Sequence, residues 1–280
     1  LFMGLLRKRV WLNSHTKSHW HCNIMQSELK IGIIGGSGME NPAFISNSNS
    51  KYISTPYGNP SSKLIFGAIE DIQVVILSRH GSGHSINPTN VNYRANISAL
   101  KEEGCTHILA ATACGSLRER IAPGHFVFPN QFIDRTNKRI NTFFDGSDVR
   151  HVSMGEPFSA MMRSCLVEAC KSLGFEHHNE ATVITIEGPR FSTKAESMMF
   201  RSWGCDIINM STVPEIVLAR ELDLHYQSIA MSTDYDCWHE SKEEVSIDMI
   251  YAVMEKNVNN VKKLIEKTIP LISKKYKKEN

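Results

Sequence analysis

The chain has 280 residues, of which 41% are hydrophobic, so it is long enough for one large domain with a substantial core. Its 31 basic and 29 acidic residues give a net charge of +2, a balance that does not favour a nucleic-acid partner. No run approaches the roughly 20 apolar residues that a bilayer-spanning helix needs, so we expect no membrane partner.

Residues 1–29 differ in composition from the rest of the chain. They are basic, contain no Asp and a single Glu, and include His15, His19 and His21. Transit peptides and added leaders have this composition. We therefore expect residues 1–29 to be a disordered leader or tag-like extension and residues 30–280 to form one domain. Metal binding by the three histidines is the rival interpretation of the segment.

In the first half of the domain, apolar runs are separated by turn residues and by one helical pattern. Strands are predicted at residues 30–34, around Leu64 and Val74, at residues 107–112 and on either side of Pro129. The runs near Leu64 and Val74 are joined by a short polar turn, which indicates a hairpin. Residues 91–103 have helical periodicity and end before Gly104, a residue typical of helix ends.

The second half continues the alternation of strands and helices. Helices are predicted at residues 159–173, at residues 193–203, near Pro214 and from about residue 246 towards residue 272, and strands at residues 182–187, 206–210 and 228–233. The pattern indicates a single-domain α/β fold in which helices flank both faces of a central twisted sheet, and the hairpin makes that sheet mixed. Ligands of such folds bind beyond the carboxyl ends of strands.

Three of the predicted strands are followed by groups that suit an anion. The segments are Gly35-Gly36-Ser37-Gly38, Arg79-His80-Gly81 and Thr112-Ala113-Cys114-Gly115-Ser116. Glycines let the backbone approach an anion, Arg offers a planar fork, and hydroxyls donate hydrogen bonds. Singly, each segment has an ordinary interpretation as a tight turn or a solvated arginine. Jointly, they predict one phosphate site at the edge of the sheet.

Asp234 and Asp236 follow the strand predicted at residues 228–233. Two carboxylates two residues apart point the same way if the strand continues, and each raises the pKa of the other. One of them can then hold a proton for a leaving group while the other accepts a hydrogen bond. A metal-binding pair is the rival interpretation, but no cluster of histidines stands beside the two Asp residues. Helix capping or surface polarity is the ordinary alternative.

Seven stretches of the domain carry a resemblance to a known family. They are IGIIGGSG, LSRHG, NPTNVNYRANI, CTHILAATACGSLRE, IEGPRFSTKAES, INMSTVPE and AMSTDYDCW. From residue 30 to about residue 270 the chain resembles the 5′-methylthioadenosine phosphorylases, a family of the trimeric purine nucleoside phosphorylase superfamily. Residues 1–29 lie outside the resemblance.

The resemblance implies a purine nucleoside phosphorylase-like fold and a pentosyltransferase activity. The implied reaction is phosphorolysis of 5′-methylthioadenosine to adenine and 5-methylthioribose 1-phosphate, in purine and methionine salvage. Inorganic phosphate is the co-substrate, and no metal or organic cofactor is implied. The implied assembly is a homotrimer in the cytoplasm, with a nuclear pool left open.

The resemblance also implies roles for individual residues. The implied phosphate-binding residues are Ser37, Arg79, His80, Thr112, Ala113 and Ser211. The implied residues around the nucleoside are Phe191 and Ser192 at the base, Met210 at the ribose, Ile247, Ile250 and Tyr251 at the 5′-methylthio group, and His151 reaching a neighbouring subunit's ligand. The implied catalytic residues are Asp234 at purine N7 and Asp236 at the 6-amino group. Relatives commonly carry Thr where this chain has Ser37 and Ser211, and an aliphatic residue where it has Tyr251. The resemblance therefore leaves the affinity for phosphate and the selectivity at the 5′ end open.

Four rival functions differ in what they require of the sequence. A 6-oxopurine phosphorylase favours a donor such as Asn at the base, where this chain has two Asp residues. Adenosine as a further substrate needs a partner for its 5′-hydroxyl, which the apolar Ile247 and Ile250 do not offer. A dinucleotide-binding protein needs an acidic residue about 20 residues after the glycine-rich turn, where Ser54 and Thr55 stand. A non-catalytic nucleoside sensor would bind the base without phosphate-dependent turnover.

Overall fold

The computed structural model describes residues 28–35, 44–240 and 247–279, with residues 247–256 and 279 described in their backbone only. Nearly all of the expected leader therefore lies outside the described residues, as does Ser37. None of the described helices is both long enough and apolar enough to cross a membrane.

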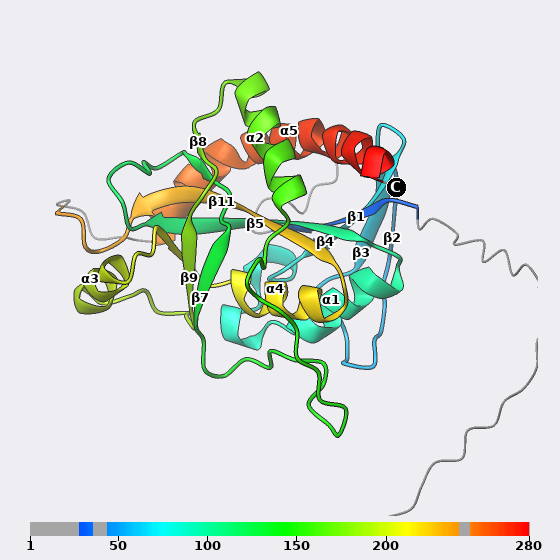
Figure 1. The fold of residues 1–280 in the computed structure, drawn as a ribbon, viewed down its shortest axis with the longest axis horizontal. Coiled ribbons are helices and arrows are strands. Elements are labelled where there is room, and N and C mark those ends of the chain that lie inside the picture. The colour runs from blue at the N-terminus through cyan, green and yellow to red at the C-terminus, as the bar shows by residue number, and fades with distance from the viewer. Residues whose placement is uncertain (1–27, 36–43, 241–246, 280) are drawn as a thin grey trace, which may run out of the picture.

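In the described part of the chain, eleven strands form one mixed sheet (Figure 1). Its main path runs through β2 (Ser46–Lys51), β3 (Leu64–Ile69), β4 (Ile72–Ser78), β1 (Lys30–Gly35), β5 (His107–Ser116), β10 (Ile207–Asn209), β9 (Thr182–Ile186) and β7 (Gln131–Arg135). A branch leaves β5 through β11 (His225–Tyr235), β6 (Phe126–Val127) and β8 (His177–His178).

The strand pairing confirms the predicted mixed sheet. β1 pairs parallel with both β4 and β5, whereas β3 and β4 form the expected antiparallel hairpin. Glu70 allows the tight turn of this hairpin by adopting a positive φ of 52°. The edge strand β2 was not predicted, because its sequence SNSNSK is polar throughout and exposed on both faces.

Helices cover both faces of the sheet, as predicted. In Figure 1, α2 (Ala160–Leu173) and α5 (Ile247–Glu279) lie above the sheet, and α1 (Tyr93–Glu102) and α4 (Thr212–Glu221) lie below it. A shorter helix, α3 (Lys194–Ser202), packs Phe200 against strand residues Ile184 and Ile208. The predicted helices are present to within a few residues, except that α5 continues seven residues past the expected end at residue 272.

The core lies in two layers, one on each face of the sheet. Strand β1 supplies both layers, because its side chains alternate between the two faces. Ile34 packs with Leu100 of α1 on one face, whereas Ile31 and Ile33 pack with Leu166 of α2 on the other. This two-sided burial explains why the central strands are apolar runs without polar alternation.

β5 and β11 extend further than predicted, and this changes the setting of the candidate site. The strand expected at residues 107–112 continues to Ser116, and β11 continues through Asp234 to Tyr235. The groups expected in loops after these strands are therefore held in the sheet, where β5 and β11 pair in parallel. Their register shifts once: Ser232 pairs with Cys114 and Asp234 with Gly115, so Thr233 is the extra residue of a β-bulge.

Candidate active site

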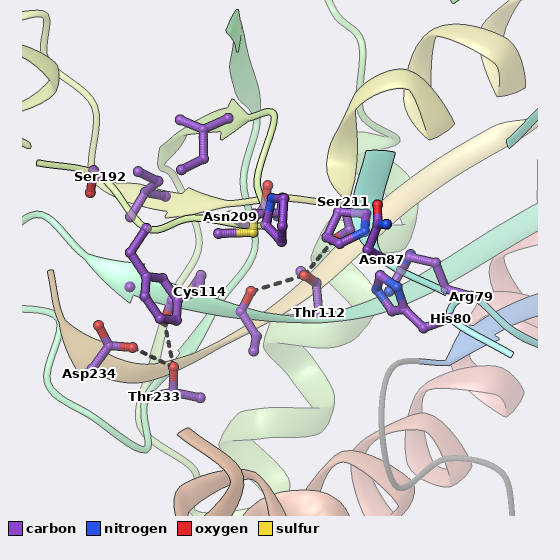
Figure 2. A pocket seen from close by; sticks show the side chains of 18 of the residues that line it. Arg79, His80, Asn87, Thr112, Cys114, Ser192, Asn209, Ser211, Thr233 and Asp234 are labelled. Atoms are coloured by element: carbon purple, nitrogen blue, oxygen red, sulfur yellow. Dashed lines mark hydrogen bonds between the residues drawn. The ribbon is translucent and has the colours of Figure 1, made fainter. Parts of the chain in front are cut away.

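A cavity of about 430 Å³ opens beside the last residues of β4, β5 and β11. Its floor is the end of β5, and the segments that follow β4, β9, β10 and β11 form its walls. The lining includes many of the residues that the sequence singled out, namely Arg79, His80, Thr112, Ala113, Phe191, Ser192, Met210, Ser211, Asp234 and Asp236. Figure 2 shows Asp234 and Thr233 at one end and Arg79 and His80 at the other, with Thr112 and Ser211 near the latter.

Arg79 is buried at the end of β4 rather than solvated. It is 1% exposed, and its Nε and Nη2 atoms donate to the two carboxylate oxygens of Glu215 at 2.5 and 3.0 Å. Nη1 donates to the carbonyl of Ala111 at 2.8 Å. Burial lowers the pKa of Arg79, but the charge and hydrogen bonds of Glu215 outweigh burial and hold that pKa above its usual value. The guanidinium is thus a fixed cation at the cavity wall.

His80 lies beside Arg79 and is held in its neutral form. Burial and the charge of Arg79 lower the pKa of His80 to about 3. Its Nδ1 is 2.9 Å from the Ile86 carbonyl, an oxygen that only accepts, so in the neutral ring Nδ1 carries the proton and Nε2 is an acceptor. The ring also stacks on His84, at the end of the short 3₁₀ turn Ser82–His84. His80, which the resemblance implied as a phosphate-binding residue, could donate from Nε2 to an anion only as the imidazolium or in the other tautomer.

Two hydroxyl groups complete this end of the cavity. Thr112 of β5 and Ser211, the residue before α4, lie 99 positions apart in the chain, yet their Oγ atoms are 2.7 Å apart. The Thr112 hydroxyl can donate to Ser211 or to the Ala113 carbonyl, which is 3.0 Å away, and when it donates to Ser211 the proton of Ser211 remains for a ligand. Arg79, Thr112, Ala113 and Ser211 therefore surround a space suited to a small oxyanion.

The other end of the cavity carries two buried carboxyl groups. Asp234 is 9% and Asp236 is 5% exposed. The Thr233 hydroxyl donates to Oδ1 of Asp234 at 2.7 Å, and the Ser192 hydroxyl lies 2.9 and 2.7 Å from the two oxygens of Asp236. Gly115 packs against this pair so closely that a Cβ there would lie 3.2 Å from Oδ2 of Asp234.

The two carboxyl groups differ in how they are stabilised. The pKa of Asp234 is raised to about 6, chiefly by burial and also by the charge of Asp236, while the hydrogen bond from Thr233 opposes the rise. The sequence predicted the direction of this shift from the neighbouring carboxylate, but burial is the larger cause. Asp234 thus exchanges its proton close to neutral pH, whereas Asp236 is an acceptor held by Ser192.

This shift predicts that Asp234 makes the stability of the protein depend on pH. The folded state binds the proton more tightly than the unfolded state, so the contribution is fully present below the ordinary pKa of 3.8 and is lost as the pH rises through about 6. Asp234→Asn cannot ionise and should gain up to about 3 kcal/mol over the wild type across this range. Denaturant unfolding of both proteins at about pH 4 and about pH 8 measures the gain. A difference between the proteins that is the same at both pH values would contradict the raised pKa.

Apolar side chains also line the cavity. They include Ile186, Ile208, Met210 and Phe191, and 41% of the surface of Phe191 is exposed. A flat apolar ring fits between such side chains, with the carboxyl groups at its edge. The cavity therefore combines an oxyanion end and a carboxyl end with apolar side chains in its wall.

Five predicted site residues are not placed in the cavity. Ser37 lies outside the described residues. Ile247, Ile250 and Tyr251 begin α5, where only the backbone is described. His151 is exposed in the segment between β7 and α2 and is not among the lining residues of the same chain.

Other residues of the site were missed at the level of sequence. Glu215 is fully buried against Arg79, although an acidic residue after Pro214 had the ordinary explanation of a helix start. Thr233 is the bulge residue that donates to Asp234. Asn87 and Pro88 reach the cavity from the segment before α1. An acidic residue within the apolar run of residues 213–219 was the one available signal for Glu215.

Comparisons with known proteins place the chain in a family. A family model described as the phosphorylase superfamily matches residues 30–270. The chain belongs to the phosphorylase superfamily, as the resemblance implied. S-methyl-5′-thioadenosine phosphorylase of Danio rerio is 54% identical over 251 residues, covering 88% of this chain and 90% of its own, and that of Xenopus tropicalis is 53% identical, covering 88% and 89%.

Solved structures agree with the sequence relatives. Methylthioadenosine phosphorylase from Schistosoma mansoni, in complex with adenine, is 43% identical with a TM-score of 0.84, covering 88% of this chain and 92% of its own. A mutant adenosine/methylthioadenosine phosphorylase from the same organism, in complex with methylthioadenosine, is 42% identical with a TM-score of 0.83 and the same coverage. The predicted purine nucleoside phosphorylase-like fold is therefore confirmed.

Proposed function

We propose that this phosphorylase uses inorganic phosphate to split 5′-methylthioadenosine into adenine and 5-methylthioribose 1-phosphate. The observation that carries the proposal is the arrangement of one cavity, with Arg79, Thr112 and Ser211 at one end and Asp234 and Asp236 at the other. The names of the relatives, which are S-methyl-5′-thioadenosine phosphorylases at about half identity, support the same substrate.

In the proposed reaction, a phosphate oxygen bonds to C1′ of the ribose while the bond from C1′ to N9 of the purine breaks. The electrons of that bond move into the purine ring, and Asp234 gives its proton to N7. Asp236 accepts a hydrogen bond from the 6-amino group. Arg79 and the two hydroxyls hold phosphate against C1′, so positioning supplies much of the acceleration. The reaction needs no metal or organic cofactor, because phosphate is the nucleophile and Asp234 is the acid.

Adenine release tests the proposal directly. The purified protein is incubated with 5′-methylthioadenosine, adenosine or inosine, each with and without phosphate, and free base is quantified. We expect phosphate-dependent cleavage of 5′-methylthioadenosine and none of inosine. Cleavage of inosine with 5′-methylthioadenosine ignored would contradict the substrate, and the absence of any turnover would favour the nucleoside sensor. Equal cleavage of adenosine would mean that selectivity at the 5′ end is broad.

The raised pKa of Asp234 also predicts a pH dependence of catalysis. A general acid must be protonated in the free enzyme, so kcat/KM for the nucleoside should fall with increasing pH above about 6. The measurement is a pH profile at a constant concentration of phosphate dianion, so that ionisation of phosphate does not contribute. A profile that stays flat from about pH 5.5 to about pH 8 would show that this proton is not used.

We also propose that the protein assembles as a trimer in which His151 reaches the ligand of the next subunit. Exposed apolar side chains in the same segment, Ile140 and Val149, support a contact there. Analytical ultracentrifugation tests the trimer, and a monomer at micromolar concentration would contradict it. A cytoplasmic location, with a nuclear pool left open, stays a prediction that imaging of a tagged protein can check.

A further inference from the structure

A buried carboxylate that does not line the cavity holds a cationic side chain that does. Glu215 lies on α4 with 0% of its surface exposed, and it is not among the residues that line the cavity. Both of its oxygens accept from Arg79, and Oε2 also accepts from the Tyr226 hydroxyl at 2.9 Å. Tyr226 belongs to β11, so the carboxylate ties α4, β4 and β11 together behind the cavity wall.

The hydrogen bonds of Arg79 determine which of its donors remain for a ligand. A guanidinium has five N–H donors in one plane. Glu215 takes Nε–H and one donor of Nη2, and the Ala111 carbonyl takes one donor of Nη1. Nη1 and Nη2 each keep one donor, and the plane of the group is fixed by Glu215 on one edge. Since Ala111 directly precedes Thr112 in β5, this contact holds the guanidinium beside the hydroxyls of the oxyanion end.

We propose that Glu215 is a positioning residue that orients Arg79, so that the two remaining donors face phosphate. The inference rests on the proposed phosphate site and goes beyond it, because Glu215 itself contacts neither substrate. A bidentate pair fixes both the place and the plane of an Arg side chain, which a single hydrogen bond does not. Tyr226 in turn holds the carboxylate by donating to Oε2.

The charge of Glu215 and its geometry have opposite effects on phosphate, and this makes the proposal testable. Its negative charge offsets that of Arg79, so removing the charge alone would strengthen phosphate binding. Its bidentate contact orients the free N–H donors of Arg79, so losing that contact weakens the binding of phosphate. If positioning dominates, Glu215→Gln and Glu215→Asp both raise KM for phosphate, since Gln loses the second acceptor oxygen and Asp is one methylene shorter. If charge dominates, the Gln variant has a lower KM for phosphate and the Asp variant behaves as wild type.

Steady-state kinetics with phosphate as the varied substrate decides between the two. For Glu215→Gln we expect KM for phosphate to rise about tenfold or more, with KM for the nucleoside within about twofold of wild type. The matched control is Glu221→Gln on the same helix, where the carboxylate accepts from Thr142 and the backbone of Phe143. Its KM for phosphate should not change. Melting temperatures of all variants establish that each is folded in the assay.

An unchanged or lower KM for phosphate in folded Glu215→Gln would overturn the proposal. If that variant does not fold, Tyr226→Phe replaces it, because it removes the hydroxyl that holds Glu215 and leaves the Arg79 pair in place. A rise of about two- to fivefold in KM for phosphate is then expected, and an unchanged value counts against positioning. A wild-type protein without phosphate-dependent turnover would instead contradict the proposed function.

Discussion

Replacing Asp234 by Asn should lower kcat for phosphorolysis by about 10²–10⁴-fold. The amide is close in size to the carboxyl group and can still accept from Thr233, so the local fold should persist. It cannot transfer a proton to N7, and the purine must then leave with its negative charge unrelieved. The measurement is adenine release under saturating 5′-methylthioadenosine and phosphate.

The control for this variant is Asp223→Asn. Asp223 precedes β11 at the end opposite Asp234, and its positive φ of 54° suits Asn as well as Asp. It loses the same charge near the same strand, and we expect its kcat to match the wild type. Near-normal turnover of the Asp234 variant would remove Asp234 from the mechanism and leave Asp236 as the candidate acid.

Replacing Asp236 by Asn should shift selectivity from 6-aminopurine towards 6-oxopurine nucleosides. The Ser192 hydroxyl would still donate to Oδ1 of the new side chain, leaving the amide N–H₂ to face the base. The 6-amino group, which is a donor, would then face another donor. The oxygen of a 6-oxopurine, which is an acceptor, would gain a hydrogen bond. Because a buried polar group without a partner is strongly disfavoured, the ratio of kcat/KM for 5′-methylthioadenosine to that for inosine should fall about 100-fold or more.

Ser192→Ala separates recognition of the base from the support of Asp236. This variant keeps the carboxylate and loses only the hydroxyl that orients it. The ratio of kcat/KM for 5′-methylthioadenosine to that for inosine should therefore change much less than in Asp236→Asn. An Asp236→Asn variant whose ratio equals that of the wild type would show that Asp236 does not recognise the substituent at position 6 of the purine. The 6-amino group would then need another acceptor in the cavity wall.

Local pattern predicted the elements of the fold well where burial is two-sided or periodic. β1 and α2 follow from a buried apolar run and from helical spacing closed by Gly174, whose φ is 68°. β2 has neither signal, since it forms through its pairing with β3 and buries nothing. The length of β5 was missed because its last residues are stabilised by β11, which lies more than a hundred residues further along the chain.

The candidate site was predictable where the residues themselves carry the chemistry. Arg79, Thr112 and the two Asp residues stand at strand ends and are hydrogen-bonding or acidic groups, so their types and positions indicated a site. Glu215 and Thr233 act through other side chains, and their importance depends on which neighbours the fold brings to them. The tautomer of His80 depends on the Ile86 carbonyl, a backbone contact that sequence patterns do not encode.

The bulge at Thr233 determines on which face of the sheet the catalytic side chain of Asp234 lies. Strand side chains alternate between faces, so one extra residue exchanges the faces of every residue after it. Because of that extra residue, Asp234 pairs with Gly115 and shares its face, where a glycine leaves room for a carboxyl group. In an unbulged strand Thr233 would pair with Gly115, and Asp234 would point to the other face. A chain with every catalytic side chain present, but with β11 paired without the bulge so that Thr233 lies opposite Gly115, would thus carry its acid on the wrong side of the sheet.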